Sequence, residues 1–351
     1  MRLRRVAASI CGLLVLLAAG CGDSSSPDPP RAYWGAWIGD QLTGTEAPWD
    51  MKAVSAFEGI AGKRASIVHL AAPFADCSQS PCSFYDFPAA AMENIRDHGS
   101  IPFFSWSSQS IPSAPDEPNF ELADVISGRY DSFIRTFAEA AKGWGHPFFL
   151  RYDWEMNGNW FPWAESGNDN RPGQFVAAWR HVHDIFTDVG AGNVTWVWCP
   201  YVDGAHKLTP LAGLYPGDSY VDWTCLDGYN WGTRRSGPTT KGWQSFGDIF
   251  GSAYRELTET IAPSKPVAIG EVGSTEQGGS KAAWLADMLA TLPRRFPRVR
   301  ALVYFEKYDD GMDWPIETSD SAKATFAKGI AAPYYVPNDY SGLDTSLIPP
   351  P

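Results

Sequence analysis

Residues 147–199 open with PFFLRY (147–152) and close with NVTWVWC (193–199), two short apolar runs rich in β-branched and aromatic residues. Between these runs, residues 175–189 carry apolar side chains at spacings of three, four and seven positions, the pattern of one face of a helix. A strand, an amphipathic helix and a second strand in this order are typical of a parallel sheet with both faces covered. The stretch therefore predicts an α/β fold.

The same unit recurs along the chain: there are eight short apolar runs, and helical patterns lie between several of them. Eight strand–helix units close as a (β/α)8 TIM barrel, which is the fold that we expect. A doubly wound open sheet is the competing architecture, but its phosphate-binding fingerprints GxGxxG and GxxxxGKS/T are not found in the sequence. The predicted strands are Tyr33–Ile38, Ser66–Ala71, Ile101–Trp106, Pro147–Tyr152, Asn193–Cys199, Val221–Asp227, Pro266–Gly270 and Arg300–Phe305.

Composition narrows the possible partners. The 351 residues include 28 Lys and Arg against 40 Asp and Glu, a formal net charge of −12. Such an acidic surface repels phosphate backbones, so we expect no nucleic-acid partner. The 16 tryptophans, 14 tyrosines and 19 phenylalanines exceed what a core of this size requires. Aromatic side chains are therefore available for a binding site. Separately, we expect the protein to act as a monomer.

The N-terminus predicts the compartment. Three arginines precede the apolar stretch Val6–Ala19, which is too short to span a bilayer comfortably and runs into LAAGC (17–21). This pattern resembles a bacterial lipoprotein signal, in which Cys21 is lipidated; the alternative is an ordinary cleaved signal peptide. We therefore expect a signal peptide over 1–20, a lipidated cysteine and linker over 21–31, a barrel over 32–332 and a tail over 333–351. The protein would be secreted and held at the bacterial cell envelope by its lipid.

Four other cysteines would then lie in an oxidising compartment. We expect Cys77 to pair with Cys82 across a small loop, and Cys199 with Cys225 between adjacent strand ends. Four buried thiols are the alternative. No paired CxxC and no HExxH motif is present, so we expect neither a metal nor a cofactor.

In a TIM barrel the chemistry lies at the carboxyl ends of the strands. The fourth predicted strand leads into RYDWEMNGNWFPW (151–163), the sixth into LDGYNWG (226–232) and the seventh into IGEVG (269–273). Glu155 and Glu271 therefore face each other across the opening. Paired carboxyl groups beside aromatic rings suit glycoside hydrolysis, in which one group must be protonated and the other ionised. The alternative is that either glutamate merely forms an ion pair with Arg151.

These segments resemble glycoside hydrolase family 26, a family of retaining β-mannanases. The resemblance extends from about Tyr33 to Trp314 and is carried by E-M-N-G-x-W at 155–160 and G-E-x-G-S at 270–274. It implies that Glu155 is the acid/base and Glu271 the nucleophile. It also assigns sugar-site positions to Trp160, to the strand-three Trp106, and to Tyr229, which would hydrogen-bond the nucleophile.

The sequence departs from the family at two points. The family usually has histidine directly before the acid/base, where this chain has Trp154, and a tryptophan on strand eight, where this chain offers Tyr304 or Phe305. Loop tryptophans 163, 231 and 314 are further candidates for stacking on sugars. The predicted substrate-binding residues are Trp106, Arg151, Trp154, Trp160, Tyr229 and Trp231.

Together these features predict a retaining endo-β-glycanase that hydrolyses β-1,4-linked hexosans, with β-mannan as the first substrate. Mixed-linkage glucan and xylan are alternative polymers for the same mechanism. A catalytically weak, glycan-binding surface lipoprotein and a transglycosylase are alternative functions. In each case the partner is a polysaccharide, and the membrane is contacted only through the lipid.

Overall fold

The computed structural model describes residues 30–202, 209–233, 242–309, 311–343 and 347–351. The predicted signal peptide and the lipidation site Cys21 lie outside these residues. No helix in the described ranges is both long and apolar enough to cross a membrane.

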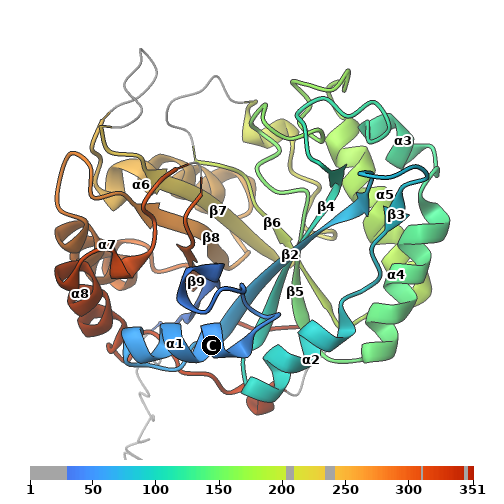
Figure 1. The fold of residues 1–351 in the computed structure, drawn as a ribbon. Coiled ribbons are helices and arrows are strands. Elements are labelled where there is room, and N and C mark those ends of the chain that lie inside the picture. The colour runs from blue at the N-terminus through green and yellow to red at the C-terminus, as the bar shows by residue number, and fades with distance from the viewer. Residues whose placement is uncertain (1–29, 203–208, 234–241, 310, 344–346) are drawn as a thin grey trace, which may run out of the picture.

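Eight parallel strands form a closed barrel, as predicted (Figure 1). Each strand pairs with the next, and the first strand pairs with both the second and the last, so that the sheet has no free edge. A short strand, β3 (Ser83–Phe84), pairs antiparallel with the end of β2 and was not predicted. The barrel strands are β1 (Tyr33–Ile38), β2 (Ile67–Asp76), β4 (Ile101–Ile111), β5 (Phe148–Tyr152), β6 (Val194–Trp198), β7 (Trp223–Asn230), β8 (Val267–Ser274) and β9 (Val299–Glu306).

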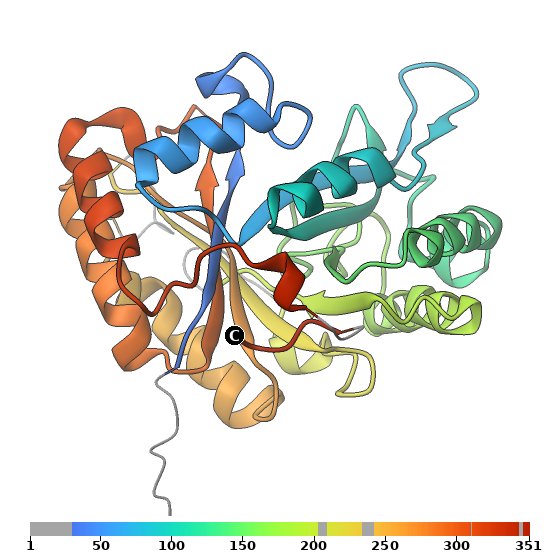
Figure 2. The same ribbon diagram turned by 90° about the horizontal axis from the view of Figure 1, so that it is seen from below.

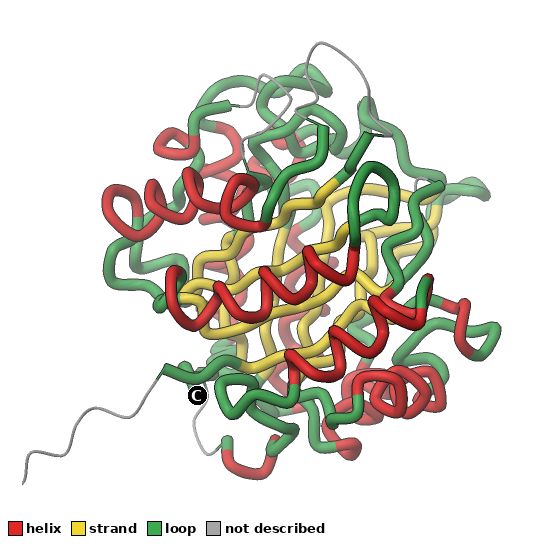
Figure 3. The backbone as a smooth tube through the Cα atoms, turned by 90° about the vertical axis from the view of Figure 1, so that its left-hand side faces the viewer, coloured by secondary structure: helices red, strands yellow, loops and turns green. Residues whose placement is uncertain are grey.

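Helices surround the strands on the outside (Figure 3). They bury their predicted apolar faces: in α5, for example, Phe175, Trp179 and Val182 are all buried. The sequence favoured an end of α4 at Gly143, but the helix runs to Trp144 and ends at Gly145, whose φ of 75° suits a residue without a Cβ. The helices are α1 (Met51–Ala61), α2 (Ala89–His98), α3 (Leu122–Ile126), α4 (Asp131–Trp144), α5 (Gln174–Val189), α6 (Phe246–Glu256), α7 (Lys281–Arg295) and α8 (Asp320–Ile330).

Both expected disulfides are formed. Cys77–Cys82 closes the turn between β2 and β3, and Cys199–Cys225 joins the end of β6 to β7. The second disulfide lies inside the barrel, where both cysteines are fully buried.

The C-terminal tail crosses the amino-terminal end of the barrel (Figure 2). The backbone N–H of Ile348 donates to Thr195 Oγ1 at 2.9 Å, and Trp223 Nε1 donates to the carbonyl of Ile348 at 3.0 Å. Both partners lie at the starts of their strands, and Ile348 is buried. The tail therefore covers the end of the barrel opposite the predicted site.

Candidate active site

The carboxyl ends of the strands surround a cavity of about 750 Å³ that contains both predicted catalytic glutamates. Its walls are mainly aromatic. The aromatic lining residues are Trp37, Trp154, Trp160, Phe161, Tyr201, Tyr229, Trp231, Phe305 and Trp314. A cavity of this size and character suits a ligand with apolar faces and a few polar groups.

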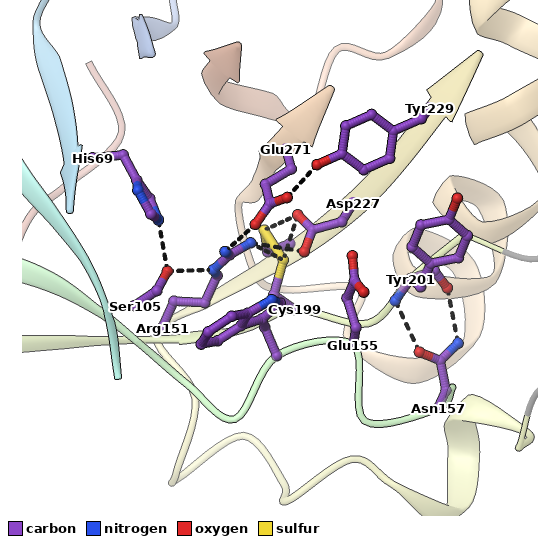
Figure 4. Close-up of polar contacts among 12 residues, drawn as sticks. His69, Ser105, Arg151, Glu155, Asn157, Cys199, Tyr201, Asp227, Tyr229 and Glu271 are labelled. Carbon is purple, nitrogen blue, oxygen red and sulfur yellow. Dashed lines mark hydrogen bonds and ion pairs between the residues drawn. A yellow bond between two sulfur atoms is a disulfide. The ribbon is translucent and has the colours of Figure 1, made fainter. Parts of the chain in front are cut away.

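Glu271 lies on β8 and is held from two sides (Figure 4). Arg151 Nη2 donates to its Oε1, and the Tyr229 hydroxyl donates to its Oε2. The side chain is almost fully buried. Two donors, one of them a cation, are aimed at this carboxyl group and fix its direction.

Arg151 lies beneath the cavity rather than in its wall. Its Nη1 donates to Asp227 Oδ2 at 2.7 Å and its Nε to Ser105 Oγ at 2.8 Å, while the side chain is completely buried. The expectation that Arg151 binds substrate is therefore corrected, because Arg151 does not line the cavity and its donors are engaged by Ser105, Asp227 and Glu271. Its position makes it a support for Glu271.

Glu155 follows β5 in a tightly curled turn. Asp153 and Glu155 have φ angles of 41° and 54°, in the left-handed region that residues with a Cβ seldom adopt. The turn is held because Ser108 donates its backbone N–H and its hydroxyl to the Asp153 carboxylate, at 2.7 and 2.6 Å. The N–H of Glu155 donates to the carbonyl of Cys199 at 2.7 Å. Strained backbone is thus used to direct one carboxyl group into the cavity.

Burial and the nearby charge of Glu271 raise the pKa of Glu155 to about 8. Trp160 Nε1 donates to Glu155 Oε2 at 2.5 Å, which opposes the rise by stabilising the ionised form. At neutral pH Glu155 is therefore protonated, and the negative charge that helps to raise its pKa is that of Glu271. This is the division of roles that acid-assisted displacement requires.

Asp227 is a buried residue of this site that was not predicted. Its Oδ2 pairs with Arg151, and its Oδ1 lies 3.2 Å from Cys199 Sγ (Figure 4). Asp227, Cys199 and Cys225 are the group of three potential metal ligands in the described residues. Because the two sulfurs are bonded to each other, the group offers a metal only the Asp227 carboxylate.

The sequence profile that describes glycosyl hydrolase family 26 matches residues 86–265. This chain belongs to glycosyl hydrolase family 26. The chain is 33% identical over 301 residues to Endoglucanase H of Acetivibrio thermocellus, which covers 85% of this chain and 30% of that protein. It is 26% identical over 245 residues to a mannan endo-1,4-beta-mannosidase of Bacillus subtilis, covering 67% of this chain and 60% of that protein.

Solved structures have the same fold. The Cellulomonas fimi endo-beta-1,4-mannanase double mutant superposes with a TM-score of 0.65 at 17% identity, covering 90% of this chain and 75% of that one. A GH26 beta-mannanase from Bacteroides ovatus gives 0.62 at 16% identity, covering 90% and 92%. The chain spans less than half the length of several relatives, including 30% of Endoglucanase H.

In this family 26 chain, four of the predicted substrate-binding aromatic residues line the cavity: Trp154, Trp160, Tyr229 and Trp231. Trp106 does not. Its neighbour Ser105 faces the barrel interior and contacts Arg151, so Trp106 points outward and stacks on Phe137 of α4, with ring centroids 4.2 Å apart. Successive strand residues point to opposite faces, which corrects the expectation that Trp106 binds sugar.

The same alternation decides which residue of strand β9 faces the cavity of this family 26 barrel. Phe305 lines the cavity, whereas Tyr304 points outward, packs on Phe326 and donates its hydroxyl to the carbonyl of Trp314. Trp314 lines the cavity. Trp163 does not: it is buried against Trp154 and Phe161 and donates to the carbonyl of Trp154 at 2.6 Å.

Trp37 and Tyr201 line the cavity and were not predicted. Both lie at strand ends, where the sequence offered a usable signal: Trp37 near the end of β1 and Tyr201 just after β6. Tyr201 is fixed by two reciprocal hydrogen bonds of 2.8 Å between its backbone and the Asn157 side-chain amide (Figure 4).

Proposed function

We propose that this protein is a retaining endo-β-glycanase that hydrolyses β-1,4-linked hexosans by double displacement. The observation that carries the proposal is the pairing of an oriented Glu271 carboxylate, held by Arg151 and Tyr229, with a buried Glu155 whose pKa is raised to about 8. Family membership supports the same reaction class.

In the first step, a Glu271 oxygen bonds to the anomeric carbon as the bond from that carbon to the glycosidic oxygen breaks. Glu155 gives its proton to the departing oxygen. In the second step, Glu155 takes a proton from water, the water oxygen bonds to the anomeric carbon, and Glu271 leaves as a carboxylate. Configuration at the anomeric carbon is inverted twice and therefore retained.

The charge on Glu271 helps Glu155 to change from acid in the first step to base in the second. The negative charge of Glu271 helps to raise the pKa of Glu155 and keeps it protonated before the first step. Once Glu271 is esterified by the sugar, that charge is gone, so the pKa of Glu155 falls after it has lost its proton. Its carboxylate is then present to act as the base.

Mannan is the first polymer to test, in line with the mannan endo-1,4-beta-mannosidases among the relatives. A specific observation favours β-glucan as the second: Endoglucanase H is matched over 85% of this chain at 33% identity. Trp154, in place of the histidine usual in the family, lies in the cavity wall beside Glu155 and bears on the choice of sugar.

The test is release of reducing sugar from galactomannan, glucomannan, mixed-linkage glucan and xylan, with Glu271→Ala as the inactive control. Release from one polymer, absent in the control, supports a glycanase and identifies its sugar. Binding without release on any polymer would favour the glycan-binding alternative. NMR of the first product formed would distinguish retention from inversion at the anomeric carbon. An inverted product would contradict double displacement.

We further propose that the mature protein is anchored at the bacterial cell envelope through lipidated Cys21. The support is the sequence of residues 1–21. In a bacterial host, Cys21→Ser should abolish labelling by a radioactive fatty acid and move the protein out of the membrane fraction. A membrane-bound Cys21→Ser protein would contradict the proposal.

A further inference from the structure

A second groove lies between the start of α1 and the start of α2, two neighbouring helices in Figures 1 and 2. It encloses about 520 Å³ and shares no lining residue with the catalytic cavity. Ala71, Ala72 and Pro73 of β2 line it together with Trp49, Tyr85 and Asp86 from the segments that lead into the two helices.

The groove lies one strand away from the catalytic cavity around the barrel. Trp37 lines the cavity and stacks on His69 of β2, with ring centroids 4.1 Å apart. Two residues farther along β2, Ala71 begins the stretch that lines the groove. Both hollows are therefore at the carboxyl ends of the strands, one strand apart.

Trp49 is exposed over 55% of its surface and is the only tryptophan of the described residues with more than half of its surface open. An indole at the rim of a hollow offers a ligand a large flat apolar face together with an N–H donor. Here alanine and proline leave room beside the indole, and Asp86 is exposed next to Tyr85.

These groups match a neutral sugar. A pyranose presents an apolar C–H face to an aromatic ring and hydroxyl donors to a carboxylate. The groove's lining contains no lysine, arginine or histidine that would attract a phosphate or an acidic ligand. We infer that this groove is a distal subsite that binds a sugar unit of the polysaccharide whose cleaved bond lies between Glu155 and Glu271. The inference rests on the proposed glycanase function.

A distal subsite adds binding only for chains long enough to reach it from the catalytic cavity. The test therefore compares kcat/KM on hexasaccharides and trisaccharides, using the mannose and cellulose series. Trp49→Ala should lower the hexasaccharide-to-trisaccharide ratio of kcat/KM by about fivefold, and Trp49→Phe should restore most of it. Phe84→Ala is the matched control, because Phe84 is an exposed aromatic residue (40%) outside the groove and should leave the ratio as in the wild type.

An unchanged ratio in Trp49→Ala would overturn the inference. If light scattering showed that this variant changes its oligomeric state while the ratio stays the same, the inference would be overturned as well. If the wild type cleaves none of these sugars, the proposed function fails and calorimetry then decides on the groove. Tighter binding of a hexasaccharide than of the trisaccharide, lost in Trp49→Ala, would support it; equal binding by both proteins would overturn it.

Discussion

Glu155 and Glu271 both place a carboxyl group in one cavity, and the proposed mechanism gives the two groups opposite tasks. Both side chains are buried, but Glu271 accepts hydrogen bonds from Arg151 and Tyr229, whereas Glu155 accepts one from Trp160. Because burial raises the pKa of Glu155 to about 8, the acid form is present at neutral pH and is lost as the pH rises through that value. Activity should therefore decline on the alkaline side.

The alkaline limb should respond to Trp160. Its indole N–H stabilises the ionised Glu155, so Trp160→Phe should raise the pKa of Glu155 further and move the alkaline fall in kcat/KM upward by about one pH unit. The pH profile of each protein measures this shift. Trp231→Phe is the control, because Trp231 donates to Tyr201 instead. A downward shift in Trp160→Phe would contradict the assignment of Glu155 as the acid.

Arg151 should matter for both stability and turnover. Arg151→Met leaves the buried Asp227 and Glu271 without their cation, which should cost roughly 3–5 kcal/mol of unfolding free energy. Loss of the orientation of Glu271 should lower kcat by about 100-fold. Chemical denaturation and steady-state kinetics measure the two effects.

Adding Asp227→Asn to Arg151→Met removes one of the unpaired charges. The double variant should regain part of the stability but none of the activity, since Glu271 is still unsupported. If turnover recovered together with stability, Arg151 would be a purely structural residue.

At the scale of elements, the two-residue period of the strands decides which side chains reach the cavity. Ser105 points in and Trp106 out, while Phe305 points in and Tyr304 out. The eight strands form where they were predicted, although several of their ends differ, and the resemblance to the family had assigned Trp106 to the sugar site. The sequence predicts where a strand ends more readily than it predicts to which face of the sheet a given side chain points.

The two disulfides should contribute unequally to stability. Cys199–Cys225 closes a separation of 26 residues and Cys77–Cys82 one of 5. Chain entropy predicts stabilisation of about 3.5 kcal/mol for the first and about 2 kcal/mol for the second. Thermal unfolding of the two double-alanine variants should therefore show the larger fall in Tm for Cys199→Ala/Cys225→Ala. An equal or opposite order would show that loop length is not the controlling factor.

For the whole molecule, the C-terminal tail and the candidate active site lie at opposite ends of the barrel. The tail and its buried Ile348 cover the amino-terminal end, while both glutamates lie at the carboxyl end. A chain that ends at Gly342 should lose about 2–4 kcal/mol of unfolding free energy and keep the kcat of the wild type. Urea denaturation and steady-state kinetics test this separation.

Ile348→Ala should reproduce part of the loss of stability in the full-length chain. Unchanged stability in the truncated chain would show that the contacts of the tail contribute nothing. A fall in kcat of the folded, truncated protein would instead connect the tail to the site.

The sequence by itself determined the barrel, the two disulfides and the glutamate positions. Each depends on local patterns: apolar runs of strand length, helical periodicity, and polar residues directly after a strand. Family membership followed from the motifs around Glu155 and Glu271, and the family profile confirms it. These features can be predicted from the sequence because they depend mainly on residues that are close together along the chain.

Only the tertiary structure decided what surrounds the two carboxyl groups. Arg151 meets Asp227 across 76 positions of sequence and Glu271 across 120. The curled turn at Glu155, held by Ser108 and Cys199, and the groove at Trp49 likewise join separate segments of the chain. The closing of the barrel brings these groups together, and burial then determines their charges. Local sequence patterns contain no information on burial by residues so far away, which is why Arg151 was expected in the cavity and lies beneath it.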